Sequence, residues 1–243
     1  MDQTGHTVKA YDKELNRLSN VIAQMGGLAE SQIASAIEAV VKRDADLAAR
    51  TVEADAKIDE LEREVDEFVV RLLALRQPMA SDLREIVSAL KIAADLERAA
   101  DHAKSVAKRA IALAQVPPVK PAYTIPRMGK MVQRMITDVL DAYVERDADK
   151  ALVVWRADEE VDESYNSLFR ELLTYMMEDP RNISTCAHLL FVAKNIERMG
   201  DLATNIAETI HYVVHGVALP QDRPKSDITS LTVVQPDVDD TTG

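Results

Sequence analysis

Acidic side chains recur at intervals of three and four residues in the first half of the chain. Asp55, Asp59, Glu62 and Asp66 are spaced 4, 3 and 4 residues apart. At about 100° per residue, this spacing places the four side chains in one stripe along a helix. Gathered carboxylates raise one another's pKa values unless a cation neutralises them. Hard cations prefer all-oxygen ligands, so the stripe predicts a metal-binding patch.

A second pair of acids, Glu97 and Asp101, is one helical turn apart and borders an apolar stripe. In an antiparallel three-helix bundle, the two acidic edges would face each other. Similar pairs occur again in the second half of the chain, where Asn205 adds a carbonyl oxygen but Tyr165 stands in place of Glu62. The candidate metal ligands are Asp55, Asp59, Glu62, Glu97, Asp101, Asp158, Asp162, Glu197, Asp201 and Asn205.

The alternative interpretation of these acids is a solvated helix face. The chain has 41 acidic residues, so the spacing also arises by chance, as it does at Glu145 and Asp149. The metal interpretation is favoured because four of the pairs recur at matched places in both halves.

The chain is one unit written twice. Residues 43–55 and 146–158 read almost alike at an offset of 103, and the same offset aligns Met25-Gly26 with Met128-Gly129. Further along, the offset falls to 100, and residues 96–101 match residues 196–201. Two copies of about 100 residues indicate a tandem of two small units.

The composition and the apolar periodicity predict helices. Only 7 of 243 residues are Gly, and Ala, Leu, Glu, Arg and Met dominate. Apolar residues follow the helical period, Asp44 or Asp46 is a candidate N-cap, and Gln77-Pro78 ends the second helix. We therefore expect an all-α fold of two tandem antiparallel three-helix bundles. The expected parts are a disordered N-terminus (1–9), a first bundle (10–115), a Pro-rich linker (116–126), a second bundle (127–218) and a disordered acidic tail (219–243).

The charge and the apolar content exclude several classes of function. A formal net charge of −12 argues against nucleic-acid binding, which needs a basic face. No apolar run approaches the ~20 residues of a membrane span, and the N-terminus does not resemble a secretory signal. The single Cys186 cannot form an internal disulfide, which indicates a reducing cytoplasm.

These features together resemble the PhoU family, phosphate-signalling accessory proteins of bacteria. Each unit ends its second helix with a Pro break and carries Glu-Arg-x-x-Asp on its third. The resemblance covers about residues 10–218. It rests on the segments Ile58–Glu62, Asp95–Ala103 and Asn195–Asn205.

The resemblance implies both a site and a role. The family's Asp/Glu-x-x-x-Asp motifs, which bind multinuclear iron or other metal clusters in some members, map onto Asp55/Asp59, Glu97/Asp101, Asp158/Asp162 and Glu197/Asp201. The ion expected here is iron, zinc, magnesium, manganese or calcium. The implied role is negative regulation of the phosphate-starvation response and of phosphate uptake, without enzymatic activity. The implied partners are the ATPase subunit of the phosphate ABC transporter, a phosphate sensor histidine kinase and a second copy of the chain. The implied location is the cytoplasm, at membrane complexes.

The rival hypothesis is a carboxylate-bridged metal protein with redox or storage chemistry. Di-iron and di-manganese carboxylate proteins use Glu-x-x-His pairs in a four-helix bundle. No His lies three residues after Glu97 or Glu197, which disfavours an oxidase-type site. A purely structural helical adaptor is a third alternative.

Overall fold

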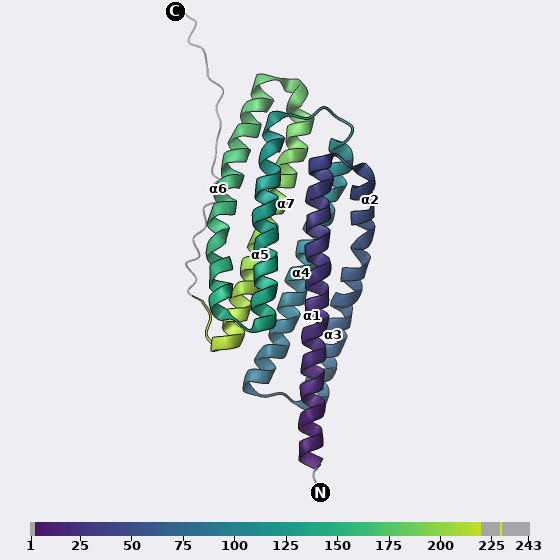
Figure 1. Cartoon of the computed structure of the whole chain (residues 1–243), viewed down its shortest axis with the longest axis vertical. Coiled ribbons are helices and arrows are strands. Elements are labelled where there is room, and N and C mark those ends of the chain that lie inside the picture. The colour runs from purple at the N-terminus through teal and green to yellow at the C-terminus, as the bar shows by residue number, and fades with distance from the viewer. Residues whose placement is uncertain (1–2, 220–228, 230–243) are drawn as a thin grey trace, which may run out of the picture.

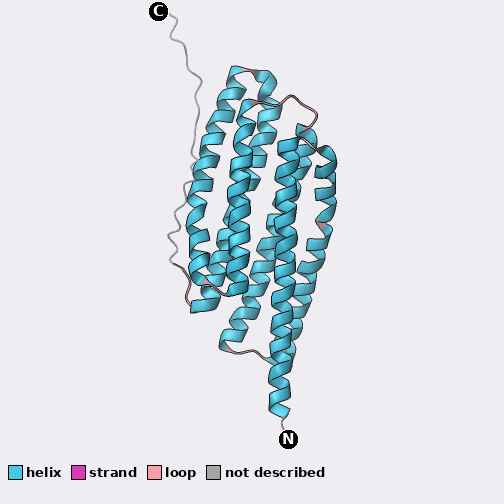
Figure 2. Cartoon of the chain, in the orientation of Figure 1, coloured by secondary structure: helices cyan, strands magenta, loops and turns pink. Residues whose placement is uncertain are grey.

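The computed structural model describes residues 3–219 and 229, and every regular element in that part of the chain is helical (Figure 2). None of these helices is both long and apolar enough to cross a membrane. The elements are α1 (Gln3–Lys42), α2 (Ala45–Ala54), α3 (Ala56–Arg76), α4 (Ala80–Leu113), α5 (Ile125–Glu145), α6 (Ala148–Glu178) and α7 (Ile183–His215), with short 3-10 helices η1 (Lys120–Thr124) and η2 (Pro180–Asn182).

Two elongated bundles lie side by side (Figure 1). The first contains α1, the α2–α3 pair and α4, and the second contains α5, α6 and α7. This arrangement confirms the predicted tandem of three-helix bundles. The predicted second helix differs in one respect, because a one-residue break at Asp55 divides it into α2 and α3.

Matched caps start the second helix of each bundle. The Asp44 side chain accepts a hydrogen bond from the Leu47 backbone N–H at 2.8 Å. Asp147 likewise accepts from the Asp149 and Lys150 backbone N–H groups at 2.9 and 3.0 Å. Such side chains satisfy backbone donors that have no partner within the helix. The sequence prediction of a cap at Asp44 is confirmed.

The bounds predicted for the ends of the units differ from those in the structure. α1 begins at Gln3, whereas residues 1–9 were expected to be disordered. The expected linker, 116–126, contains η1 and the first residues of α5, which begins at Ile125. Pro126 lies in the first turn of α5, where its missing N–H costs no hydrogen bond. Almost all of the expected acidic tail, at 220–228 and 230–243, lies outside the described residues.

The two bundles share one hydrophobic core through α1–α5 and α4–α7. Two glycines from matched positions make reciprocal contacts across the first of these pairs. A Cβ built on Gly26 would lie 2.3 Å from Leu140, and one built on Gly129 would lie 2.7 Å from Ile37. Each copy thus supplies one glycine and one large apolar residue to the contact. The two matched halves of the sequence are therefore related by an approximate two-fold axis at this contact.

Candidate functional site

Five of the predicted ligands form a first acidic patch between the second and third helices of the first bundle. Asp55, Asp59 and Glu62 come from the α2–α3 break and from α3, and Glu97 and Asp101 come from α4. Burial raises the pKa of Glu97 to about 7, and the charges of the other four acids act in the same direction. Burial and neighbouring acids also raise the pKa of Glu62. The two acidic edges therefore face each other, as the spacing predicts.

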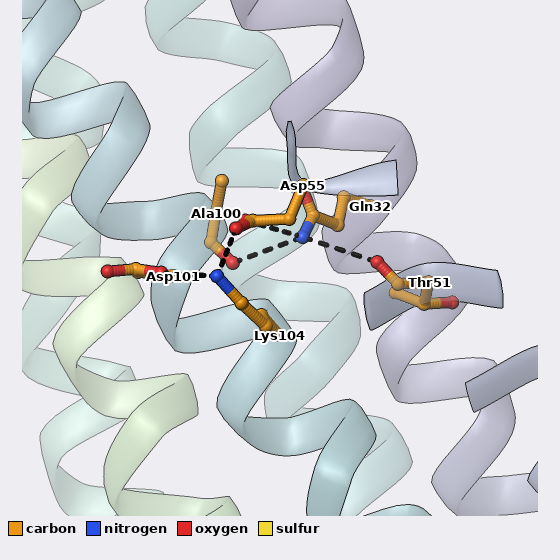
Figure 3. A network of polar contacts seen from close by, with 6 residues as sticks. All are labelled: Gln32, Thr51, Asp55, Ala100, Asp101 and Lys104. Carbon is orange, nitrogen blue, oxygen red and sulfur yellow. Dashed lines mark hydrogen bonds and ion pairs between the residues drawn. The ribbon is translucent and has the colours of Figure 1, made fainter. Parts of the chain in front are cut away.

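The carboxylate of Asp55 in this patch is buried. Gln32 on α1 donates from Nε2 to Asp55 Oδ1 at 3.0 Å (Figure 3). The same amide nitrogen lies 3.4 Å from the Ala100 carbonyl oxygen and 3.5 Å from that of Thr51. One glutamine therefore connects three helices at the point where the second helix of the bundle breaks.

Lys104 on α4 occupies the other side of Asp55. Its Nζ donates to Asp55 Oδ2 and lies 3.4 Å from Asp101 Oδ1 (Figure 3). The side chain of Asp55 is 3% exposed and that of Lys104 is 29% exposed. The hydrogen bond to Asp55 raises the pKa of Lys104. Lys104 is thus a cation within the patch.

The second acidic patch is more deeply buried. Asp158 and Asp162 on α6 and Glu197 on α7 are only 1–3% exposed. A Cβ built on Gly200 would lie 3.2 Å from Asp158 Oδ1, so the glycine allows α7 to approach this carboxylate closely. Here too a lysine is present, because Lys194 Nζ donates to Glu197 Oε1 at 2.8 Å.

The structure brings Asp201 and Asn205 together with Asp101 of the first copy, in a groove between the bundles. This cavity of about 490 Å³ lies along the α4–α7 contact, and two matched arginines line it. Its lining residues are Arg98, Asp101, His102, Arg198, Asp201, Leu202 and Asn205. The predicted ligand set is therefore divided among two patches and one shared groove.

Polar contacts tie α4 to α7 at this groove. Asp95 accepts a hydrogen bond from Asn205, and His102 Nδ1 lies 2.9 Å from Asn195 Oδ1. Burial raises the pKa of Asp95 to about 6, although Arg98 and Asn205 act in the opposite direction. Burial also lowers the pKa of His102. At neutral pH Asp95 is therefore mostly ionised beside the groove, and burial favours the uncharged form of His102 in its wall.

The carboxylate oxygens of the patches are the ligands that hard cations prefer. Their positions in this structure, however, do not form a metal site. In the described part of the chain no three His, Cys, Asp or Glu side chains are placed so that they could hold a metal ion. Both oxygens of Asp55 already accept hydrogen bonds, from Gln32 and Lys104. The residues in this geometry do not fit a bound metal, and ligation stays a prediction.

Sequence reasoning did not single out the two lysines or Gln32. Lys104 lies three residues after Asp101 and Lys194 lies three residues before Glu197, spacings that place each pair on one helix face. That signal could have revealed the lysines. Gln32 is 23 residues from Asp55 along the chain, and nothing local indicates that they meet.

A larger cavity of about 710 Å³ lies between α5 and α6, and none of the predicted ligands is among its lining residues. Val153 and Val154 of α6 and the basic residues Arg127, Lys130 and Arg134 of α5 are among its lining residues. Its walls combine apolar side chains with these three cations and with the acids Asp138 and Glu160, so they carry charges of both signs.

Comparison with known proteins places this architecture. A model of the PhoU domain matches residues 22–110 and again residues 125–210. The phosphate-specific transport system accessory protein PhoU homolog of Caulobacter vibrioides (strain NA1000 / CB15N) is 54% identical over 228 residues, covering 93% of this chain and 99% of the relative. The crystal structure of PhoU from Pseudomonas aeruginosa matches with a TM-score of 0.84 at 43% identity, covering 85% of this chain and all of that one. The phosphate transport system regulatory protein PhoU from Streptococcus pneumoniae matches with a TM-score of 0.81 at 28% identity, covering 86% of this chain and 99% of that one.

Proposed function

Since the chain belongs to the PhoU family, we propose that it is a negative regulator of the phosphate-starvation response and of phosphate uptake. The observation that carries this proposal is the family match to both bundles, with a relative covering nearly the whole chain at 54% identity. The relatives named above are an accessory protein and a regulatory protein of phosphate transport. The protein acts as an accessory regulator and not as an enzyme.

The proposed means is coupling between two membrane complexes. When phosphate is plentiful, the protein connects the ATPase subunit of the phosphate ABC transporter to the cytoplasmic part of a sensor histidine kinase. The kinase is thereby kept from activating the phosphate-starvation genes. It works in the cytoplasm, held at the membrane by these partners, and associates as a homodimer. Two features support a docking role: helices of 34, 31 and 33 residues form long packed surfaces, and a net charge of −12 favours basic partner faces.

Deletion of the gene tests the regulatory role. In phosphate-rich medium, the deletion strain is expected to express alkaline phosphatase at the level of starved cells, because the kinase is no longer restrained. A plasmid carrying the full chain should return expression to the repressed level, whereas the empty plasmid should not. Alkaline phosphatase that stays repressed in the deletion strain would contradict the proposal.

The rival role is redox or storage chemistry at bridged metal ions. Purified protein that took up iron stoichiometrically and oxidised it would favour that role. Normal repression by a chain in which Glu97, Asp101, Glu197 and Asp201 are all Ala would instead separate regulation from any metal chemistry. Helical content measured by circular dichroism is the control for folding of this variant.

A further inference from the structure

Both acidic patches contain a lysine whose ammonium group contacts a buried carboxylate. In the first patch, Lys104 contacts Asp55 and Asp101. In the second patch, Lys194 contacts Glu197, whose side chain is 4% exposed. A buried carboxylate needs a nearby positive charge or hydrogen-bond donors. In each patch a side chain of this chain supplies that charge.

The two lysines do not correspond to each other in the duplication. At the offset of 100, Lys104 matches Thr204 and Lys194 matches Ala94. One lysine lies a turn after its Glu-Arg-x-x-Asp motif and the other a turn before it. The copies therefore reach the same result, an ammonium group in contact with a buried carboxylate, from opposite ends of the motif.

The residues around each lysine suit an ammonium group. Lys104 and Gln32 each take one oxygen of Asp55 (Figure 3). Lys194 Nζ lies 5.0 Å from the centroid of the Tyr165 ring, the residue that replaces Glu62 in the second copy. An aromatic face attracts an ammonium group and provides no carboxylate oxygen for a metal. The second patch has therefore exchanged a potential metal ligand for a lysine contact.

We propose that the ammonium groups of Lys104 and Lys194 are the resident cations of the two acidic patches, and that a divalent metal ion binds there only in competition with them. A metal ion close to either ammonium would meet a like charge and would have to displace it from its carboxylate. Lys104 also joins α4 to the α2–α3 break, whereas Lys194 bonds within α7 and meets α6 through the Tyr165 ring. Each lysine thus offsets one negative charge of its patch, and we call the lysine with its carboxylate contacts a clasp.

Manganese binding to the full chain tests this proposal. The probe is Mn²⁺ added to chelator-treated protein, with free Mn²⁺ measured by electron paramagnetic resonance. The variants are Lys104→Met and Lys194→Met, and the matched control is Lys108→Met, which removes an exposed lysine one turn further along α4. Each clasp variant is expected to bind Mn²⁺ at least about tenfold more tightly than wild type, a change of about 1.4 kcal/mol. The control should bind as wild type does.

Thermal unfolding provides a second measurement. Without metal, the clasp variants should unfold at a lower temperature than wild type, and Mn²⁺ should raise their midpoints more than that of wild type. Equal or weaker Mn²⁺ binding in both clasp variants would overturn the proposal. Should these variants fail to fold, manganese retention by the wild-type protein tests the proposal. Stoichiometric manganese retained by wild type after gel filtration would overturn the proposal, and its loss would support it.

Discussion

At the scale of single residues, the half-buried Asp95 can set a pH dependence. It lies between Arg98 on its own helix and Asn205 on α7, and its side chain is 13% exposed. The matched position in the second copy is Asn195, which has the same shape without the charge. The first copy therefore keeps an ionisable group at the contact between bundles where the second copy does not.

We expect the contribution of Asp95 to wild-type stability to fall as the pH rises from about 4 through about 6. Its pKa in the folded protein, about 6, is above the ordinary 3.8, so the folded state binds this proton more tightly than the unfolded state. The contribution is fully present below the ordinary pKa and is lost as the pH passes the folded value. Asp95→Asn removes this loss and should raise the free energy of unfolding at pH 8 by on the order of 2 kcal/mol relative to wild type.

Urea unfolding of both proteins at pH 5 and pH 8 measures this effect. The advantage of Asp95→Asn should be larger at pH 8. The control is Asp141→Asn, which removes an exposed carboxylate on α5 and should differ little from wild type at either pH. An advantage of the same size at both pH values would show that Asp95 does not titrate in this range.

Among the helices, the contact between α1 and α5 depends on two glycines with reciprocal neighbours. A Cβ on Gly129 would lie 2.7 Å from Ile37 Cγ2 and 2.8 Å from its Cδ1. Ile37 is 5% exposed and packed on all sides, so it cannot move away without disturbing the core. Gly27, on the same helix as Gly26, has no atom within 4 Å of such a Cβ and serves as the matched control.

We expect Gly129→Ala to lower the free energy of unfolding by about 1–3 kcal/mol, the usual cost of overpacking a core. Gly27→Ala should instead raise it by up to about 1 kcal/mol, because Ala favours the helix. Urea unfolding measures both changes. In a background of Ile37→Ala, the cost of Gly129→Ala should become smaller, since the clashing atoms are absent. An unchanged cost in that background would show that the helices do not meet here.

At the scale of the whole molecule, we expect one folding unit rather than two independent bundles. The buried residues of both bundles form one hydrophobic cluster, and α4 contacts α7 as extensively as it contacts α1. Separating the bundles would expose the faces of α1 and α4 that now pack against the second copy. Exposure of that much apolar surface removes much of the driving force for folding.

Residues 1–115 alone should therefore be less stable than the full chain. We expect the fragment to unfold at a lower urea concentration and to bind a hydrophobic dye that the full chain does not bind. The full chain should unfold in a single transition, with circular dichroism and tryptophan fluorescence of Trp155 giving the same midpoint. Two separate transitions in the full chain would show that the bundles fold independently.

The helices, the duplication and the acidic faces could be predicted from local sequence patterns, because helical periodicity and capping depend on residues only a few positions apart. The spacing of Asp55, Asp59 and Glu62 places them on one face whatever surrounds them. The sequence could not show that Gln32 reaches Asp55, or that Asp101 and Asp201 line one groove. Those outcomes depend on how helices tens of residues apart pack, and on which side chain enters the space between carboxylates. The cation of the first patch was decided by the tertiary structure, because the partners of Lys104 include a carboxylate 49 residues away. In the second patch, Lys194 and Glu197 are only three residues apart on one helix, so local spacing already places them together.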